Sequence, residues 1–392
     1  MKHHDIAIIG GSVAGGSLAS SLGRKGLEVA LIDHARFPRR KACGEGLSNV
    51  AIGALQRMGI EIGPALQTGV AYYGYRICHH DRSFSFASGR KHLLRGVGVQ
   101  RLHLDQMILD GAAASPSLTT YLETSVSEIT RDRRGHCLEL SSGQRISARQ
   151  LVLADGANSV NAAKLGIPVQ RKKKPLWGIS FIMKGSYAQA PAEVVVVLKK
   201  GFEINCTPVS TELLNITFLA EKRCVKALQD PQIITPLLEE AMEQVGFAGS
   251  AIDKPLNVGP VNHAKRPYVH DSIMLLGDAA ENLDPIAGMG MTHAVLMAEI
   301  ASELLHAHLR EGLPIEVVHA IYAKRAAHMG RAYRGFTRLT ASLLRSPLRG
   351  ALLPVAAATI LPELVRRTLD REPGQPTLRL FLPHHFISVI GV

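Results

Sequence analysis

A glycine-rich turn close to the start of the chain has the spacing of a dinucleotide-binding loop. The apolar run DIAII leads into GGSVAG, where Gly10 and Gly15 hold the outer positions of a G-x-G-x-x-G pattern and Ser12 replaces the middle glycine. Glycines in such a loop permit the tight turn and let the backbone approach a pyrophosphate at the N-terminus of the next helix. The predicted cofactor contacts in this loop are Gly10, Ser12, Val13, Ala14 and Gly15.

An acidic residue ends the second strand-like run, EVALID. Asp33 stands eighteen residues after Gly15, close to the place where a carboxylate accepts hydrogen bonds from the ribose of an adenosine. The first strand, the glycine turn, a small-residue helix and this second strand together predict a βαβ unit. The alternative is a glycine-rich turn without a ligand, in which Asp33 is an ordinary charge at a strand end.

Two later segments repeat the pattern of a buried strand that ends in glycine and aspartate. LVLADGANSV runs into Asp155 and Gly156, and SIMLLGDAAENLDPIAGMGM runs into Gly277 and Asp278 before it reaches Pro285. Each segment alone also fits a strand-to-helix turn that binds nothing. Because both segments follow the glycine loop in one chain, together they favour a dinucleotide-binding site over unrelated turns.

The three segments, in this order, resemble the FAD-binding oxidoreductases that include the group A aromatic hydroxylases, the geranylgeranyl reductases and the flavin-dependent halogenases, over roughly residues 1–310. The resemblance implies that Asp278 hydrogen-bonds the ribityl or pyrophosphate part of FAD and that Pro285 lies beside the isoalloxazine. It also implies that backbone N–H groups at Gly288 and Gly290 face the N1 and O2 edge, where reduced flavin is negative and a helix N-terminus is favourable. The implied FAD contacts in this segment are Gly277, Asp278, Pro285, Gly288, Gly290 and Met291.

The same resemblance assigns a role to the DG pair. Asp155 and Gly156 match a motif that bridges FAD and a visiting nicotinamide cofactor. Asn161 and Ala162 stand where the family often has an arginine, which weakens the case for tight nicotinamide docking. Because the chain has only one dinucleotide fingerprint, NAD(P)H is expected to be a transient reductant rather than a resident cofactor.

An arginine and a basic, cysteine-containing turn complete the implied FAD contacts. Arg101 matches an arginine that begins a helix and touches FAD, with a surface charge at a helix start as the alternative. In RRKACGEGLS the implied FAD contacts are Lys41, Cys43 and Gly44. Packing is favoured over a reactive nucleophile as the role of Cys43.

Several residues bear on the reaction. Asp284 and Met289 stand where reductases of the geranylgeranyl type usually have Asn and an acid, and Trp177 is the only tryptophan, whereas halogenases need a tryptophan-rich motif. We therefore favour an FAD-dependent monooxygenase that hydroxylates a bulky aromatic or polyketide-like substrate, free or carrier-bound, through a flavin C4a-hydroperoxide. An FAD-dependent prenyl or polyene alkene reductase is the alternative, and a non-catalytic flavoprotein is a third hypothesis.

The elements that must position these residues predict an α/β fold. We expect a doubly wound, Rossmann-like FAD-binding domain built from residues 1–68, 96–165 and 260–330. An interleaved β-sheet domain (69–95 and 166–259) is expected to cover the substrate. Prolines at 347, 354 and 362 predict a region of short helices over 331–392. The substrate lining is predicted near Tyr73, Tyr75, Phe181, Ile204 and Cys206.

Composition limits the class of protein. With 392 residues, 46% of them hydrophobic, the chain can bury a large core, so disorder is excluded. Five scattered cysteines without a C-x-x-C pair predict neither disulfides nor a metal site and suggest a cytoplasmic protein. The net charge of +12 suits an anionic cofactor, while nucleic-acid motifs are missing. No apolar run is long enough to span a membrane, but weak membrane-surface contact through the C-terminal helices stays open.

Overall fold

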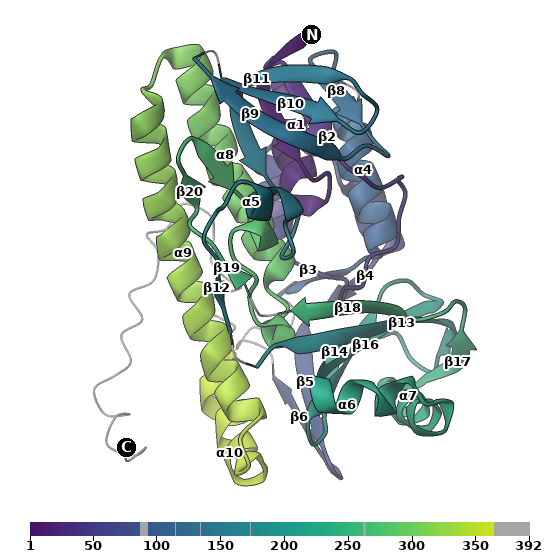
Figure 1. Ribbon diagram of the computed structural model, residues 1–392. Coiled ribbons are helices and arrows are strands. Elements are labelled where there is room, and N and C mark those ends of the chain that lie inside the picture. The colour runs from purple at the N-terminus through teal and green to yellow at the C-terminus, as the bar shows by residue number, and fades with distance from the viewer. Residues whose placement is uncertain (87–92, 114, 134, 173, 262–263, 364–392) are drawn as a thin grey trace, which may run out of the picture.

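The computed structural model describes residues 1–363 except 87–92, 114, 134, 173 and 262–263. Two eight-stranded sheets dominate the described part of the chain. Figure 1 shows the first sheet and its helices in the upper part of the molecule, the second sheet below, and a long helix running beside both. The predicted α/β fold with a second, interleaved sheet is confirmed.

The first sheet is mainly parallel. Its strands lie in the order β20 (Val269–His270), β21 (Ile273–Leu275), β11 (Arg145–Leu153), β1 (Lys2–Ile9), β2 (Val29–Ile32) and β8 (Leu118–Tyr121), and β10 (Gly135–Leu140) and β9 (Val126–Asp132) branch from β11. The runs IAII of β1 and VALI of β2 are entirely apolar and buried, which is typical of strands inside a parallel sheet that is covered on both faces.

The helices around this sheet pack closely. Helix α1 (Val13–Arg24) is buried from Val13 to Gly23 and packs against α4 (Arg101–Ala113) and α8 (Gly290–Glu311). A Cβ on Gly16 would lie only 3.1 Å from Cγ2 of Ile108 in α4. Small residues are therefore needed on α1, which fits the small-residue run after the glycine turn. Helix α2 (Asn49–Arg57) packs against α8 from a different part of the chain.

Short elements join the two sheets. Strands β3 (Gly46–Ser48), β7 (Gly96–Gly98) and β4 (Val70–Tyr72) form a three-stranded sheet. A two-stranded sheet pairs β12 (Gln170–Arg171) with β19 (Ala264–Lys265). The remaining helices here are α3 (Gly63–Thr68) and α5 (Val160–Lys164).

The second large sheet is mainly antiparallel. Its order is β17 (Phe247–Ala251), β13 (Leu176–Tyr187), β16 (Leu213–Glu221), β15 (Phe202–Pro208), β14 (Glu193–Leu198), β5 (Gly74–His79) and β6 (Arg82–Phe86), and β18 (Leu256–Val261) also pairs with β13. One face packs with α7 (Pro231–Val245) into a separate hydrophobic core, next to the short α6 (Lys222–Val225). The other face is free to form the wall of a site.

The C-terminal region differs from the prediction of short helices. Helix α9 (Ile315–Leu344) is continuous for 30 residues and runs through residue 330, where a domain boundary was predicted. The reason is that the sequence between Pro314 and Pro347 contains no proline to interrupt the helix. Short helices do follow, as α10 (Arg349–Val355) and a π-helical turn (Ala356–Ile360). The rest of the predicted region, 364–392, lies outside the described residues. No helix in the described part of the chain is long and apolar enough to cross a membrane.

Candidate functional site

The glycine turn, the DG pair (Asp155 and Gly156) and the GD pair (Gly277 and Asp278) meet at one edge of the first sheet. Strand β1 pairs with β11 through Ile9 and Leu153, and β11 pairs with β21 through Leu153 and Leu275, all in parallel. Because each of these residues ends its strand, the glycine turn, the DG pair and the GD pair follow side by side. Residues more than 260 positions apart in the sequence are thereby brought to one site.

The first turn requires its outer glycines. Gly10 has a φ of +109°, and a Cβ there would lie 2.4 Å from the carbonyl oxygen of Ala154. A Cβ on Gly15 would lie 1.9 Å from the carbonyl oxygen of Gly10. These two positions admit no side chain, whereas the hydroxyl of Ser12 in the middle position fits. Val13 and Ala14, also predicted contacts, are buried in the first turn of α1.

Asp33 holds the glycine turn from the neighbouring strand. Its Oδ2 accepts a hydrogen bond from the Gly11 N–H at 2.7 Å, and its Oδ1 accepts one from the Ala35 N–H at 2.8 Å. The guanidinium of Arg39 lies 3.9 Å from the same carboxylate. Contact of Asp33 with a ribose stays a prediction.

Arg101 is part of a buried ion pair beside the turn. Its Nε and Nη2 donate to the two carboxylate oxygens of Asp105, each at 2.8 Å, and Nη2 also donates to Ser12 Oγ at 2.6 Å. Burial would lower the pKa of Arg101, but the Asp105 carboxylate outweighs it and raises the pKa. The surface-charge alternative for Arg101 is therefore wrong, because only 4% of the residue is exposed.

Lys41 brings a second positive charge towards the same place. Burial and repulsion by Arg101 lower its pKa, while the Asp278 and Asp105 carboxylates act in the opposite direction. A cation that interacts electrostatically with both of these carboxylates suits a pyrophosphate bound nearby. The sequence had singled out Lys41, but only the fold brings its charge within the influence of Asp278.

The DG pair contains an unpaired buried oxygen. Oδ2 of Asp155 accepts a hydrogen bond from Asn161 at 2.8 Å, but the buried Oδ1 has no partner among the described residues. Arg266, which sequence reasoning missed, donates to the carbonyls of Ala157 and Ala279. Burial lowers the pKa of Arg266, and the Asp155 carboxylate opposes this shift. A guanidinium thus lies close to the DG pair although no arginine follows it in the sequence.

The space along these turns fits an elongated cofactor. A Cβ added to Gly44, Gly156, Gly288 or Gly290 would meet no atom within 4 Å. Open space at four predicted contacts, together with the unpaired Asp155 oxygen, is what a bound dinucleotide would require. Gly277 differs because it is buried, with a φ of +55°. Among the described residues, no three side chains of His, Cys, Asp or Glu come together as metal ligands.

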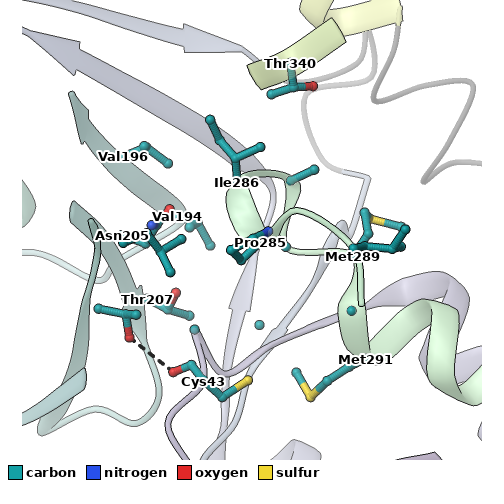
Figure 2. A pocket seen from close by; sticks show the side chains of 18 of the residues that line it. Cys43, Val194, Val196, Asn205, Thr207, Pro285, Ile286, Met289, Met291 and Thr340 are labelled. Carbon is teal, nitrogen blue, oxygen red and sulfur yellow. Dashed lines mark hydrogen bonds between the residues drawn. The ribbon is translucent and has the colours of Figure 1, made fainter. Parts of the chain in front are cut away.

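A cavity of about 260 Å³ continues this space towards the second sheet. On one side it is bounded by the segment from Pro285 to Met291, which leads into α8. On the other side lie strands β5, β14, β15 and β16, and Figure 2 shows Val194 and Val196 facing Pro285 and Ile286 across the cavity. Phe336, Thr340 and Leu344 of α9 close one end.

Most of the residues predicted to line the substrate cavity lie on the opposite face of their strands. Tyr75 lines the cavity, but Phe181, Ile204 and Cys206 pack in the hydrophobic core on the α7 face of the sheet. Tyr73 lies between β4 and β5 and is 38% exposed. Since successive residues of a strand point to opposite faces, a shift of one position exchanges the lining. The residues of β15 that line the cavity are Asn205 and Thr207.

Glu45 is a further residue whose importance the sequence did not show. It has a φ of +56°, lines the cavity, and accepts hydrogen bonds from the Arg101 N–H at 3.1 Å and from Asn215 Nδ2 at 3.3 Å. Burial raises its pKa to about 7. Cys43, two residues earlier, lines the cavity and accepts a hydrogen bond through its carbonyl from Thr217, so it is part of the wall.

A family model described as "FAD binding domain" matches residues 3–334 of this chain. The chain belongs to this FAD-binding family. The match spans the glycine turn, the DG and GD pairs, the second sheet and most of α9. The chain is accordingly an FAD-dependent oxidoreductase.

Two relatives of this FAD-binding protein have names that refer to quinones. The menaquinone reductase of Mycolicibacterium smegmatis is 26% identical over 77% of this chain and 76% of its own length. The ubiquinone hydroxylase UbiL of Rhodospirillum rubrum is 26% identical over 98% of this chain and 89% of its own. Among solved structures, PqsL of Pseudomonas aeruginosa, a probable FAD-dependent monooxygenase, has a TM-score of 0.75 at 21% identity, covering 89% of this chain and 99% of its own.

We expect Asp278→Ala to weaken FAD binding about tenfold, because the carboxylate lines the cavity beside Lys41 and a hydrogen bond to a charged group contributes about 1.5 kcal/mol or more. Titration of the apoprotein with FAD, followed by flavin fluorescence, measures the change. Asp110→Ala is the matched control, since this carboxylate is exposed on α4 and bonds only Gln106 among the described residues. Equal FAD affinity of the Asp278 variant and the wild type would contradict the predicted contact.

Proposed function

We propose that this flavoenzyme is a monooxygenase that hydroxylates the ring of an apolar cyclic substrate of the quinone or polyketide type. The observation that carries the proposal is the cavity, because its walls are mainly aliphatic and aromatic and it opens onto the segment predicted to lie beside the flavin ring. Such a cavity holds a flat ring and excludes water, which monooxygenation requires. A free small molecule and a carrier-bound substrate both fit this proposal.

FAD, when bound, supplies the reduced ring that activates dioxygen. The chain's own residues hold and orient it. We propose that the segments 1–68, 96–165 and 260–330 bind FAD, with phosphate near Ser12, Lys41 and Arg101. The N-terminus of α8 at Gly290 supplies N–H groups and a positive partial charge for the negative edge of the ring. NAD(P)H is proposed as the electron donor, visiting near Asp155 and Arg266.

An alkene reductase is a second candidate, favoured by one observation. The menaquinone reductase of Mycolicibacterium smegmatis matches three quarters of the chain at the same identity as the ubiquinone hydroxylase. Asp284 and Met289 depart from the pattern expected of geranylgeranyl-type reductases, which is why hydroxylation is placed first. Both reactions use the same FAD contacts, so an experiment on the reaction itself is needed to distinguish hydroxylation from alkene reduction.

Oxygen dependence separates the two reactions. FAD-loaded protein is reduced with light, with EDTA as the electron donor, and mixed with short-chain ubiquinone and menaquinone analogues, with and without oxygen. Quinols are reoxidised to quinones before products are identified by mass. We expect a product that has gained one oxygen atom, formed only when oxygen is present. A product that keeps two additional hydrogen atoms after this reoxidation, formed without oxygen, would support the alkene reductase instead. Free FAD under the same conditions controls for chemistry in solution.

A further inference from the structure

The cavity-facing side of the second sheet carries five polar side chains in two groups. Ser180, Asn215 and Thr217, from β13 and β16, are within hydrogen-bond distance of one another. Asn215 Nδ2 and Thr217 Oγ1 each lie 3.1 Å from Ser180 Oγ, and Thr217 Oγ1 lies 2.8 Å from Asn215 Oδ1. Asn215 also donates to Glu45. The hydrogen bonds of this first group are therefore satisfied within the protein.

The second group, Asn205 and Thr207 on β15, is different. Neither side chain forms a hydrogen bond with any described residue, and Nδ2 of Asn205 is buried without a partner. A buried polar atom that bonds nothing costs free energy, so its presence asks for an explanation. Both residues line the cavity, and Figure 2 shows them on the same wall as Val194 and Val196.

Their neighbours differ on the two sides of β15. On β16, Thr217 pairs with Asn205 and Asn215 pairs with Thr207, while the neighbours on β14 are apolar. Val196 pairs with Asn205 in the sheet register, and Val194 lies two positions further along β14. Pro285 and Ile286 stand on the opposite side of the cavity. Ile204 and Cys206 alternate with the two polar residues but pack into the core on the other face. The strand thus presents an amide and a hydroxyl, two positions apart, between the aliphatic residues of β14 and the internally bonded polar group of β13 and β16.

We propose that Asn205 and Thr207 form a polar subsite that recognises a ring oxygen, as carbonyl or hydroxyl, of an otherwise apolar cyclic substrate. This inference rests on the proposed function and names the feature by which the cavity orients its substrate. A hydroxyl donates and accepts, and the terminal torsion of asparagine is roughly two-fold, so the pair can bond either oxidation state of a quinone ring. Anchoring one ring oxygen on β15 turns a fixed part of the ring towards Pro285 and the start of α8.

A comparison of two ligands on the FAD-loaded, oxidised protein tests the subsite. Menadione carries two ring carbonyls, and methylnaphthalene is the same ring skeleton without them. Calorimetric titration should show about tenfold tighter binding of menadione to the wild type, and this preference should fall to about twofold in Asn205→Leu. Thr207→Val should reduce the preference, whereas Thr207→Ser, which keeps the hydroxyl, should retain it.

Asn257→Leu is the matched control, because Asn257 is exposed on β18 and should leave the preference unchanged. FAD content and thermal unfolding verify that every variant folds. Equal preference in the wild type and Asn205→Leu, or no preference in the wild type, would overturn the subsite. Because this experiment measures binding, its result is independent of turnover. If the protein transfers oxygen but shows no ligand preference, only the proposed subsite is contradicted. If it shows the ligand preference but no oxygen transfer, only the proposed reaction is contradicted.

Discussion

The Gly290→Leu variant should fold as the wild type does and lose FAD. Gly290 begins α8, its φ lies outside the left-handed region, and a Cβ there would meet no atom within 4 Å. Leucine therefore costs the apoprotein little. Its side chain would project into the cavity that Gly290 lines, where the flavin ring is predicted. Overpacking costs about 1–3 kcal/mol, so FAD affinity should fall by about 5–150-fold.

Flavin fluorescence titration of the apoprotein measures the affinity, and thermal unfolding of the apoprotein measures the fold. Gly53→Leu is the control: Gly53 lies on α2, where a Cβ would approach only the end of the Arg57 side chain, at 3.3 Å. Gly53→Leu should leave FAD affinity unchanged and should not lower the unfolding temperature, because leucine favours a helix more than glycine does. If Gly290→Leu keeps the wild-type affinity for FAD, the flavin ring does not lie against the start of α8. The predicted FAD contacts at Gly288 and Met291 would then be wrong as well.

The Arg345→Ala variant should lose about 2–4 kcal/mol of unfolding free energy. Arg345, just after α9, donates to Glu203 on β15 at 3.0 and 3.2 Å and to Asp284 at 2.8 and 3.0 Å. The Glu203 and Asp284 side chains are 3% and 9% exposed, so removal of the cation leaves two carboxylates buried. Breaking a buried pair costs about 3–5 kcal/mol, and the 33% exposure of Arg345 reduces this.

The loss should depend on pH. Burial raises the pKa of Glu203, with Arg345 opposing the shift, so the folded protein binds this proton more tightly than the unfolded chain. Stability from such a group is present at low pH and is lost as pH rises through the folded pKa. Without Arg345 that pKa rises further, so the loss should be larger at pH 8 than at pH 5.

Urea unfolding of the apoprotein at the two pH values measures this loss. Arg223→Ala is the control. Arg223 pairs with Glu221, and the two side chains are 69% and 50% exposed. Exposed ion pairs of this kind contribute about 0–1 kcal/mol to the free energy of unfolding. A loss that Arg345→Ala shows equally at both pH values, or one no larger than the control's, would contradict the expected role of the buried carboxylates.

The sequence by itself determined the cofactor domain. Glycine at positions 10 and 15 is required by backbone geometry, and a local requirement of that kind leaves its mark on a short motif. The apolar runs before Asp155 and Asp278 predicted parallel strands, and the carboxyl ends of such strands meet at one edge of a sheet. Fold class, FAD family and the gathering of these turns therefore followed from residues close together in the chain.

Only the tertiary structure decided the substrate side. Which face of β15 meets the cavity depends on pairing with β14 and β16, and a shift of one residue replaced Ile204 and Cys206 by Asn205 and Thr207. Arg345 meets Asp284 and Glu203 from positions 61 and 142 residues away in the sequence. Contacts of that separation carry no local pattern, because they are fixed by how helices and sheets pack rather than by the spacing of residues along the chain.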